Sequence, residues 1–283
     1  MGKYDQPERR PAVVTGASSG IGAATALRLA QAGFPVALGA RRTDRLVDVA
    51  SQIRADGGEA VVHALDLTDD DSVAEFAKAA QEQLGDIEVV VSNAGAVAPG
   101  TITEVDPERF TRELDLTVVG AHRLVRAFVP AMQERRRGDI VFVSSDTAVR
   151  PRPFMAAYSA AKWGLEGMVA SLQMELEGSG VRASVVRPGP TWSEMGTDWD
   201  PDDAAFVLNQ WVRFGLARHP HFMKPSAIAD AITTVVSAPR GVHLNLVEVS
   251  PEAPVETTPG RSSSPPLRSS GEERPGDPEK QDA

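Results

Sequence analysis

The sequence predicts one α/β domain, a doubly wound parallel sheet of about seven strands with helices on both faces. Short apolar runs alternate with longer helical stretches from residue 11 to about residue 252. Several of these runs are apolar almost throughout, which is typical of strands that helices cover on both sides. Alternation of strand and helix also requires right-handed crossovers, and these produce a parallel sheet.

The expected strands are short runs rich in valine, isoleucine, leucine and alanine, the residue pattern of a buried strand. We expect them at residues 12–14, 35–38, 60–65, 87–91, 140–143, 182–186 and 244–249.

Helices fill the intervals, the first over residues 23–32 and the longest from Pro107 to about Arg136. Apolar residues in the long helix recur every three or four positions, which favours a buried face. Leu116, Val119 and Leu124 widen that apolar stripe. The helix therefore has either a broad side against the core or a second apolar face that suits subunit association.

The two ends of the chain differ from this pattern. Residues 1–10 form an N-terminal stub without an apolar secretory segment. Residues 253–283 are rich in proline, serine and charge, so we expect a disordered tail. One folded domain, residues 11–252, remains between them.

Composition excludes several classes of protein. The chain of 283 residues has 29 basic and 39 acidic side chains, and its net charge of −10 disfavours nucleic acid and anionic membranes as partners. Cysteine is absent, which excludes disulfides, thiolate zinc sites and iron–sulfur clusters. His219 and His221 are the only histidines close in sequence, and we expect surface imidazoles there and no metal site. No apolar run approaches the roughly 20 residues that span a bilayer, and we expect a cytoplasmic protein.

A glycine-rich turn follows the first strand. It contains Gly16, Gly20 and Gly22, with Ser18, Ser19 and Ile21 between them, and it leads into the first helix. Glycines allow a tight turn and a close approach of backbone to ligand, and the free N–H groups at a helix start favour a pyrophosphate. The alternative is that the glycines only close a turn.

This turn and four later motifs resemble the short-chain dehydrogenase/reductase family. Residues 15–22 have the spacing TGxxxGxG, and the later motifs are Asn93-Ala94-Gly95, Ser145, a Tyr158-x-x-x-Lys162 pair and Pro188-Gly189. The resemblance spans about residues 11–250. It implies a Rossmann-like catalytic domain, a nicotinamide dinucleotide cofactor, interconversion of a carbonyl and a secondary alcohol, and a homodimer or homotetramer.

The second strand ends in Ala40-Arg41-Arg42, where NAD-binding sites of this type usually carry a carboxylate for the ribose 2′-hydroxyl. A guanidinium can instead bind a 2′-phosphate with paired, charged hydrogen bonds. We therefore expect NADP(H) in preference to NAD(H), with Arg41 as the first choice for the phosphate contact and Arg42 as the second. The alternative is a pair of arginines on an exposed loop.

The resemblance implies further cofactor contacts. Asp66 and Leu67 would face the adenine, although Asp66 could equally cap the helix that begins near Asp69. The segment of Asn93, Ala94 and Gly95 would stabilise the sheet and pass beside the cofactor. Pro188 and Gly189 would hold backbone against the nicotinamide, and Ser193 would reach its carboxamide, with Thr191 as the near competitor.

Tyr158 and Lys162 lie one helical turn apart, so their side chains share a face. A nearby ammonium and an oxidised nicotinamide should lower the pKa of the phenol, which then exchanges a proton with a substrate oxygen. The resemblance assigns Ser145 to that oxygen and Lys162 also to the nicotinamide ribose. Ser144 is the alternative serine, but alternation along a strand directs it to the other face.

One position departs from the family pattern. Thr117 stands where the family has an active-site asparagine that supports a helix irregularity and a water leading protons to the lysine. This substitution concerns the proton relay and not cofactor binding. It also motivates an alternative function, a dinucleotide-binding sensor or interaction protein with weak or no turnover.

Residues 192–224 correspond to the variable helices that cover the substrate in the family. Six aromatic residues in or beside this segment either line an apolar pocket or belong to the core: Trp192, Trp199, Phe206, Trp211, Phe214 and Phe222. We favour an apolar ketone, aldehyde or secondary alcohol as substrate, while Arg150 and Arg152 leave room for an acidic group.

Overall fold

The computed structural model describes residues 6–97, 99–194, 199–216, 219 and 221–255. The chain divides into two compact units, Met1–Glu252 and Ala253–Ala283. The tail for which we expect disorder lies, from residue 256 onwards, outside the described residues.

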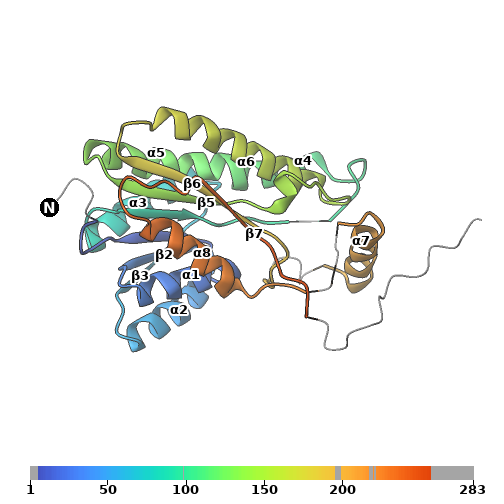
Figure 1. Cartoon of the computed structure of the whole chain (residues 1–283), viewed down its shortest axis with the longest axis horizontal. Helices are drawn as coiled ribbons and strands as arrows, with labels where there is room; N and C mark the ends of the chain where they lie inside the picture. Colours follow the sequence, from blue (N-terminus) through green and yellow to red (C-terminus); the bar gives the residue numbers. More distant parts are fainter. Residues whose placement is uncertain (1–5, 98, 195–198, 217–218, 220, 256–283) are drawn as a thin grey trace, which may run out of the picture. The chain divides into compact units, whose positions relative to one another are not determined.

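A seven-stranded parallel sheet forms the centre of the first unit, with the strand order β3-β2-β1-β4-β5-β6-β7 (Figure 1). Every pair of neighbouring strands is parallel, which confirms the predicted fold class. The strands are β1 (Ala12–Thr15), β2 (Val36–Ala40), β3 (Ala60–Ala64), β4 (Val89–Ser92), β5 (Gly138–Val143), β6 (Val181–Pro188) and β7 (Leu246–Val249). Each expected strand is found within a few residues of its predicted bounds.

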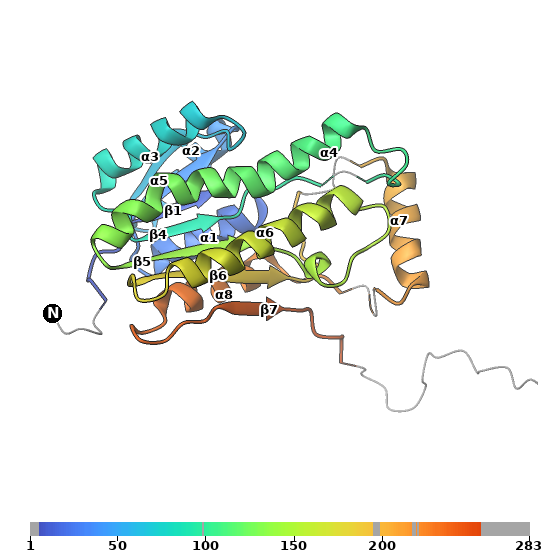
Figure 2. The same cartoon turned by 90° about the horizontal axis from the view of Figure 1, so that it is seen from above.

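Helices cover both faces of the sheet (Figure 2). On one side lie α3 (Asp70–Leu84), α4 (Pro107–Leu114), α5 (Gly120–Glu134) and α6 (Ala156–Glu175), and on the other lie α1 (Gly20–Gln31), α2 (Thr43–Ala55) and α8 (Pro225–Ser237). Phe76, Phe128 and Phe142 are fully buried in the first layer, and Leu29 and Leu46 in the second. The two cores explain why the central strands are apolar in almost every position.

Strand order changes direction at β1, because β1 lies between β2 and β4. Ligands of open α/β sheets bind at such a point, outside the carboxyl ends of the strands. The turn after β1 and the segment after β4 are in contact there, since a Cβ on Gly16 would lie 2.9 Å from Cα of Ala94. Helix α7 (Pro201–Arg213) lies beyond the same carboxyl ends (Figure 1).

The long helix predicted over residues 107–136 is one helical path in three parts. α4 is followed by a π-helical turn, Asp115–Val119, and then by α5. Leu124 is fully buried, whereas Val119 is 41% exposed. The apolar stripe is therefore divided between the core and the outer surface.

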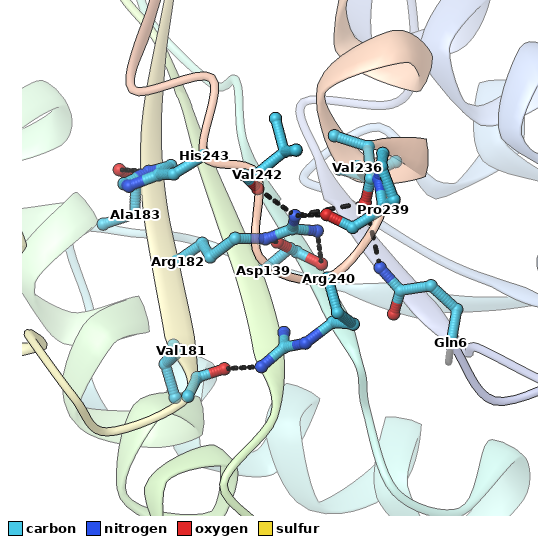
Figure 3. A network of polar contacts seen from close by, with 12 residues as sticks. Gln6, Asp139, Val181, Arg182, Ala183, Val236, Pro239, Arg240, Val242 and His243 are labelled. Carbon is cyan, nitrogen blue, oxygen red and sulfur yellow. Dashed lines mark hydrogen bonds and ion pairs between the residues drawn. The ribbon is translucent and has the colours of Figure 1, made fainter. Parts of the chain in front are cut away.

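At the amino ends of the strands, two arginines meet the buried carboxylate of Asp139 at the start of β5. Arg182 binds it through two nitrogens, at 2.6 and 3.0 Å, and Arg10 binds it as well. Arg182 also donates to the carbonyl oxygens of Ala238, Pro239 and Val242 after α8 (Figure 3). Residues of the expected N-terminal stub thus contact the domain, because Arg10 is buried and Gln6 donates to the oxygen of Ala238.

Among the residues that the structure describes, no helix combines the length and the apolar character that crossing a bilayer requires.

Candidate active site

The glycine-rich turn after β1 adopts a conformation that needs glycine. Gly16 and Gly20 have φ angles of +65° and +55°, in the left-handed region. A Cβ on Gly22 would lie 2.2 Å from the carbonyl oxygen of Gly16. Ser19, the N-cap of α1, makes no side-chain capping bond, so backbone N–H groups at this helix start remain available to an anion.

Asn93 joins the ends of β1 and β4. Its Nδ2 donates to the carbonyl oxygen of Thr15 at 2.9 Å, and the backbone N–H groups of Asn93 and Ala94 donate to Thr15 Oγ1 at 3.0 and 3.2 Å. Gly95 follows and is partly buried. The amide therefore stabilises the sheet edge on which the turn rests.

Arg42, the second choice for the phosphate contact, lies over the glycine-rich turn. Its Nη2 donates to Ser18 Oγ at 3.1 Å and to Ser19 Oγ at 2.9 Å. Its Nη1 donates to Glu194 Oε2 at 2.9 Å. Arg41, the first choice, is exposed and acts electrostatically on Asp66.

Asp66 does not cap the helix that follows it, so that alternative is wrong. Asp69 is the N-cap of α3, and its side chain accepts from the N–H of Asp71. Asp66 Oδ1 instead accepts from the N–H and the hydroxyl of Thr68, at 2.9 and 2.7 Å, and these bonds lower the pKa of Asp66. Leu67 beside it is buried.

The segment after β6 is hydrogen-bonded to β7 and to Met223. The N–H of Gly189, next to Pro188, donates to the oxygen of Val249 at 2.8 Å. The Thr191 hydroxyl donates to the oxygen of Gly189 at 2.9 Å. Ser193 packs against the turn, because a Cβ added to Gly20 would lie 3.2 Å from the Cβ of Ser193.

Tyr158, Lys162 and Ser145 come together at the carboxyl end of β5. All three are buried, with 8%, 3% and 7% of their surface exposed. Tyr158 and Lys162 project from α6, and Lys162 Nζ lies 5.6 Å from the centre of the Tyr158 ring. The same Nζ donates to the oxygen of Val143 at 2.8 Å. Ser145 is hydrogen-bonded to Tyr158, and its Oγ accepts from the N–H of Thr147 at 3.2 Å.

Ser144 points away from this group, as alternation along the strand predicts. Its hydroxyl donates to Glu166 Oε1 at 2.6 Å, and Glu166 is paired with Arg187.

Burial dominates the electrostatics of the two titratable groups. It raises the pKa of Tyr158 to about 12, and the charges of Asp146 and Glu113 act in the same direction, against the hydrogen bond from Ser145. It lowers the pKa of Lys162 to about 8. In the chain alone, desolvation thus raises the pKa of the phenol, while its expected lowering by the ammonium together with an oxidised nicotinamide stays a prediction. A protonated phenol in this position is a proton donor at neutral pH.

Thr117 lies in the π-helical turn, which packs against α6. Its side chain is 3% exposed, and its Oγ1 has no hydrogen-bond partner among the described residues. The helix irregularity thus forms without the amide of an asparagine. A buried hydroxyl of this kind can bind a water molecule of a proton relay.

One residue beside Ser145 was not predicted as part of the site, and it pairs with Arg152, an arginine expected near the substrate. Asp146 is the following residue, and Arg152 binds both of its carboxylate oxygens. The position of Asp146 directly after the serine is the only signal in the sequence that points to it, and nothing local predicts its pairing with Arg152.

The aromatic residues of the covering segment are not ordinary core. Trp192, Phe206 and Phe214 are 63%, 50% and 61% exposed. Phe206 of α7 contacts Phe154 edge-on at 5.0 Å, and Trp192 lies 4.9 Å from Phe222.

Comparisons with known proteins agree with this geometry. The family model described as short chain dehydrogenase matches residues 10–204. A short chain dehydrogenase of Pseudocercospora fijiensis is 35% identical over 72% of this chain and 66% of its own length. Glycine betaine reductase ATRR of Emericella nidulans is 33% identical over 85% of this chain, which spans only 18% of that protein.

Two solved structures, each with a TM-score of 0.73, extend the likeness. An alcohol dehydrogenase from the archaeon Thermococcus sibiricus, complexed with 5-hydroxy-NADP, is 30% identical over 88% of this chain and all of that chain. A metagenomic short-chain oxidoreductase in complex with NADP is 33% identical and covers 87% of this chain and 98% of its own. The family match extends from β1 through the glycine-rich turn, Tyr158 and Lys162 into α7, and the chain belongs to the short-chain dehydrogenase family of oxidoreductases.

Proposed function

We propose that the protein is an NADP(H)-dependent oxidoreductase that interconverts a carbonyl compound and a secondary alcohol, with Tyr158 as the acid and base. The observation that carries the proposal is the buried contact of Tyr158 with Ser145, one helical turn from Lys162, at the same sheet edge as the glycine-rich turn. Each of the three side chains has a distinct chemical task there.

The residues of the turn fit a dinucleotide. Gly16 and Gly22 allow the turn to pack closely against the segment after β4, and the start of α1 supplies N–H donors for a pyrophosphate. Ala40 ends β2 without a carboxylate, which favours a cofactor with a 2′-phosphate. Of the two arginines after it, Arg41 is exposed, and Arg42 lies over the turn in a bond with Glu194. The structures similar to this chain that contain NADP or 5-hydroxy-NADP are consistent with that choice.

The proposed division of labour follows from the side chains. Bound nicotinamide would supply or accept the hydride. Ser145 would orient the substrate oxygen, and Tyr158, kept neutral by burial, would donate a proton to it during reduction. Lys162 would hold the nicotinamide ribose, Asp66 the adenine, and Ser193 or Thr191 the carboxamide.

The charges near the site favour an uncharged substrate. Arg150 is paired with Glu248, and Arg152 is paired with Asp146, so neither offers a free cation to an acidic group. Phe206 of α7, which is 50% exposed, supplies apolar surface beside Phe154 of the loop that carries these arginines.

We also propose that the protein associates with copies of itself, as a homodimer or homotetramer. Trp163 and Met174 of α6 are 56% and 79% exposed, and Val119 of the adjacent π-helical turn is 41% exposed. Apolar side chains of this size on neighbouring helices are typical of a protein interface.

The test is NADPH and NADH consumption over a panel of uncharged aldehydes and ketones, together with Kd for both cofactors. The proposal expects turnover, tighter binding of NADPH, and loss of turnover in Tyr158→Phe. Tight NADPH binding with equal, very slow rates in both proteins would instead indicate the dinucleotide-binding sensor. Equal or tighter binding of NADH would refute the cofactor preference.

A further inference from the structure

A buried ion pair adjoins Ser145, and its two charges act on the pKa of Tyr158 in opposite directions. Arg152 Nη1 donates to Asp146 Oδ1 at 2.8 Å, and Nη2 donates to Oδ2 at 2.6 Å. The two side chains are 8% and 9% exposed. Both carboxylate oxygens of Asp146 are therefore bound by one guanidinium, in the parallel arrangement that gives the strongest pairing.

This ion pair lies between Ser145 and helix α7. On one side, Ser145 Oγ is 3.4 Å from Asp146 Oδ1, and Ser145 is hydrogen-bonded to Tyr158. On the other side, the Arg152 guanidinium lies 4.9 Å from the centre of the Trp211 ring on α7, and Trp211 Nε1 donates to the oxygen of Pro153. A substrate oxygen bound at Ser145 and Tyr158 is thus close to both charges.

Because the two charges are buried, their balance decides which substrate charge the site can accept. A guanidinium out of water requires a partner of opposite charge, and Asp146 supplies it permanently because it belongs to the same short loop. A substrate carboxylate would have to displace Asp146 from Arg152, or lie beside it as a second buried anion. Either arrangement costs free energy that an uncharged substrate does not lose.

We propose that Asp146 is a specificity-determining residue, which neutralises Arg152 inside the substrate site and so selects uncharged carbonyl compounds. With the Asp146 charge removed and Arg152 retained, the site would accept carbonyl compounds that carry a carboxylate. With Arg152 removed and Asp146 retained, it would favour compounds that carry a cation. This inference rests on the proposed oxidoreductase function.

The test compares kcat/KM for benzaldehyde, 4-carboxybenzaldehyde and 4-(trimethylammonio)benzaldehyde in Asp146→Asn, Arg152→Gln, the double variant and the wild type. A hydrogen bond to a buried charge is worth about 1.5–3 kcal/mol, so Asp146→Asn should raise the relative use of 4-carboxybenzaldehyde by about tenfold or more. Arg152→Gln should lower it and raise the use of the cationic aldehyde. The double variant should return both ratios to within about threefold of the wild type.

Arg150→Gln is the matched control, because it removes an arginine of the same loop whose partner, Glu248, lies on β7. This variant should leave both ratios unchanged. An equal rise in the use of 4-carboxybenzaldehyde in Arg150→Gln and Asp146→Asn would overturn the proposal, as would an unchanged ratio in a folded Asp146→Asn protein. If the unpaired buried cation prevents Asp146→Asn from folding, Arg152→Gln still tests the proposal, because it should raise the relative use of the cationic aldehyde.

Binding separates this inference from the proposed function. If the wild type reduces no carbonyl compound, the proposed function fails, and calorimetric titration of the full chain with benzoate and benzamide still tests the charge selection. Asp146→Asn should then bind benzoate more tightly than benzamide, and the wild type should show the reverse order. The same order in both proteins would overturn the inference.

Discussion

At the scale of single residues, the site combines two buried groups whose pKa values are shifted because burial disfavours the charged form of each. Tyr158 has a raised pKa and Lys162 a lowered one, both because water is excluded from them. Burial of Lys162 costs folding free energy at neutral pH, where the ammonium is charged in the unfolded chain and in the fold. The site therefore carries strain that a non-functional side chain would relieve.

Lys162→Met should make the protein more stable at pH 7, by about 1–3 kcal/mol, because it replaces a buried charged side chain by an apolar one of comparable size. The folded pKa of about 8 lies below the unfolded value of 10.5. Between these values the unfolded state binds more protons, so wild-type stability rises with pH and the advantage of the variant shrinks. Chemical unfolding at pH 7, 8.5 and 9.5 measures this trend. Lys78→Met, at an exposed position, is the control and should show no such convergence.

Thr117→Asn tests whether the departure at this position limits the reaction. The π-helical turn already exists with threonine, and the buried hydroxyl lacks a protein partner among the described residues. We therefore expect turnover to stay within about tenfold of the wild type or to increase, with Kd for the cofactor unchanged. A complete loss of activity in a folded variant would show that Thr117 has a different role.

At the scale of elements, the turn between β1 and α1 depends on the absence of side chains. Gly22→Ala places a Cβ 2.2 Å from a backbone oxygen that cannot move without moving β1. We expect NADPH binding to weaken by at least about tenfold and the protein to lose roughly 1–3 kcal/mol of stability, as overpacked sites usually do. Fluorescence titration and thermal unfolding measure the two effects.

Gly167 in α6 provides the matched control, because a Cβ there meets nothing within 4 Å. Gly167→Ala should stabilise the protein by about 0.5–1 kcal/mol through helix propensity and leave cofactor binding unchanged. If both substitutions weakened NADPH binding equally, the close contact at Gly22 would not be the cause.

Elements were also the scale at which the sequence was most informative. Apolar runs and their spacing are local properties, so β1 to β7 and the long helix were found close to their predicted bounds. The first helix begins at Gly20 and not at residue 23, because the glycine-rich turn itself enters the helix.

Side-chain partners were less accessible to prediction, because they depend on segments that meet only in the fold. Arg42 and not Arg41 lies over the turn, Asp69 and not Asp66 caps α3, and Asp146 binds Arg152. The raised pKa of Tyr158 in the chain alone was not predicted for the same reason, since burial is a property of the whole fold.

At the scale of the folded unit, buried ion pairs join segments that are distant in sequence. Asp139, which is 2% exposed, binds Arg10 and Arg182. Arg10 donates to the carbonyl oxygen of Val236 near the end of α8. Arg182 donates to that of Ala238 directly after α8 (Figure 3). The network connects the segment before β1, the start of β5 and β6, and the end of α8. It lies at the sheet edge opposite the proposed active site.

Asp139→Asn should destabilise the protein by about 3–5 kcal/mol, because it leaves two guanidinium groups without their buried counter-charge. Denaturant unfolding measures the loss. Glu59→Gln removes the exposed partner of Arg9 and should cost no more than about 1 kcal/mol. A loss of that size in Asp139→Asn as well would mean that the network contributes little to the fold.

We propose that Tyr158 transfers the proton in a reaction that requires a nicotinamide cofactor. The most direct measurement is kcat/KM for reduction of the best carbonyl substrate by the wild type and by Tyr158→Phe, with Kd for NADPH measured on both. We expect Tyr158→Phe to lower kcat/KM by a factor of about 10²–10⁴, the usual contribution of a positioned acid, and to change Kd less than about threefold. A phenylalanine variant that retains wild-type kcat/KM would contradict it.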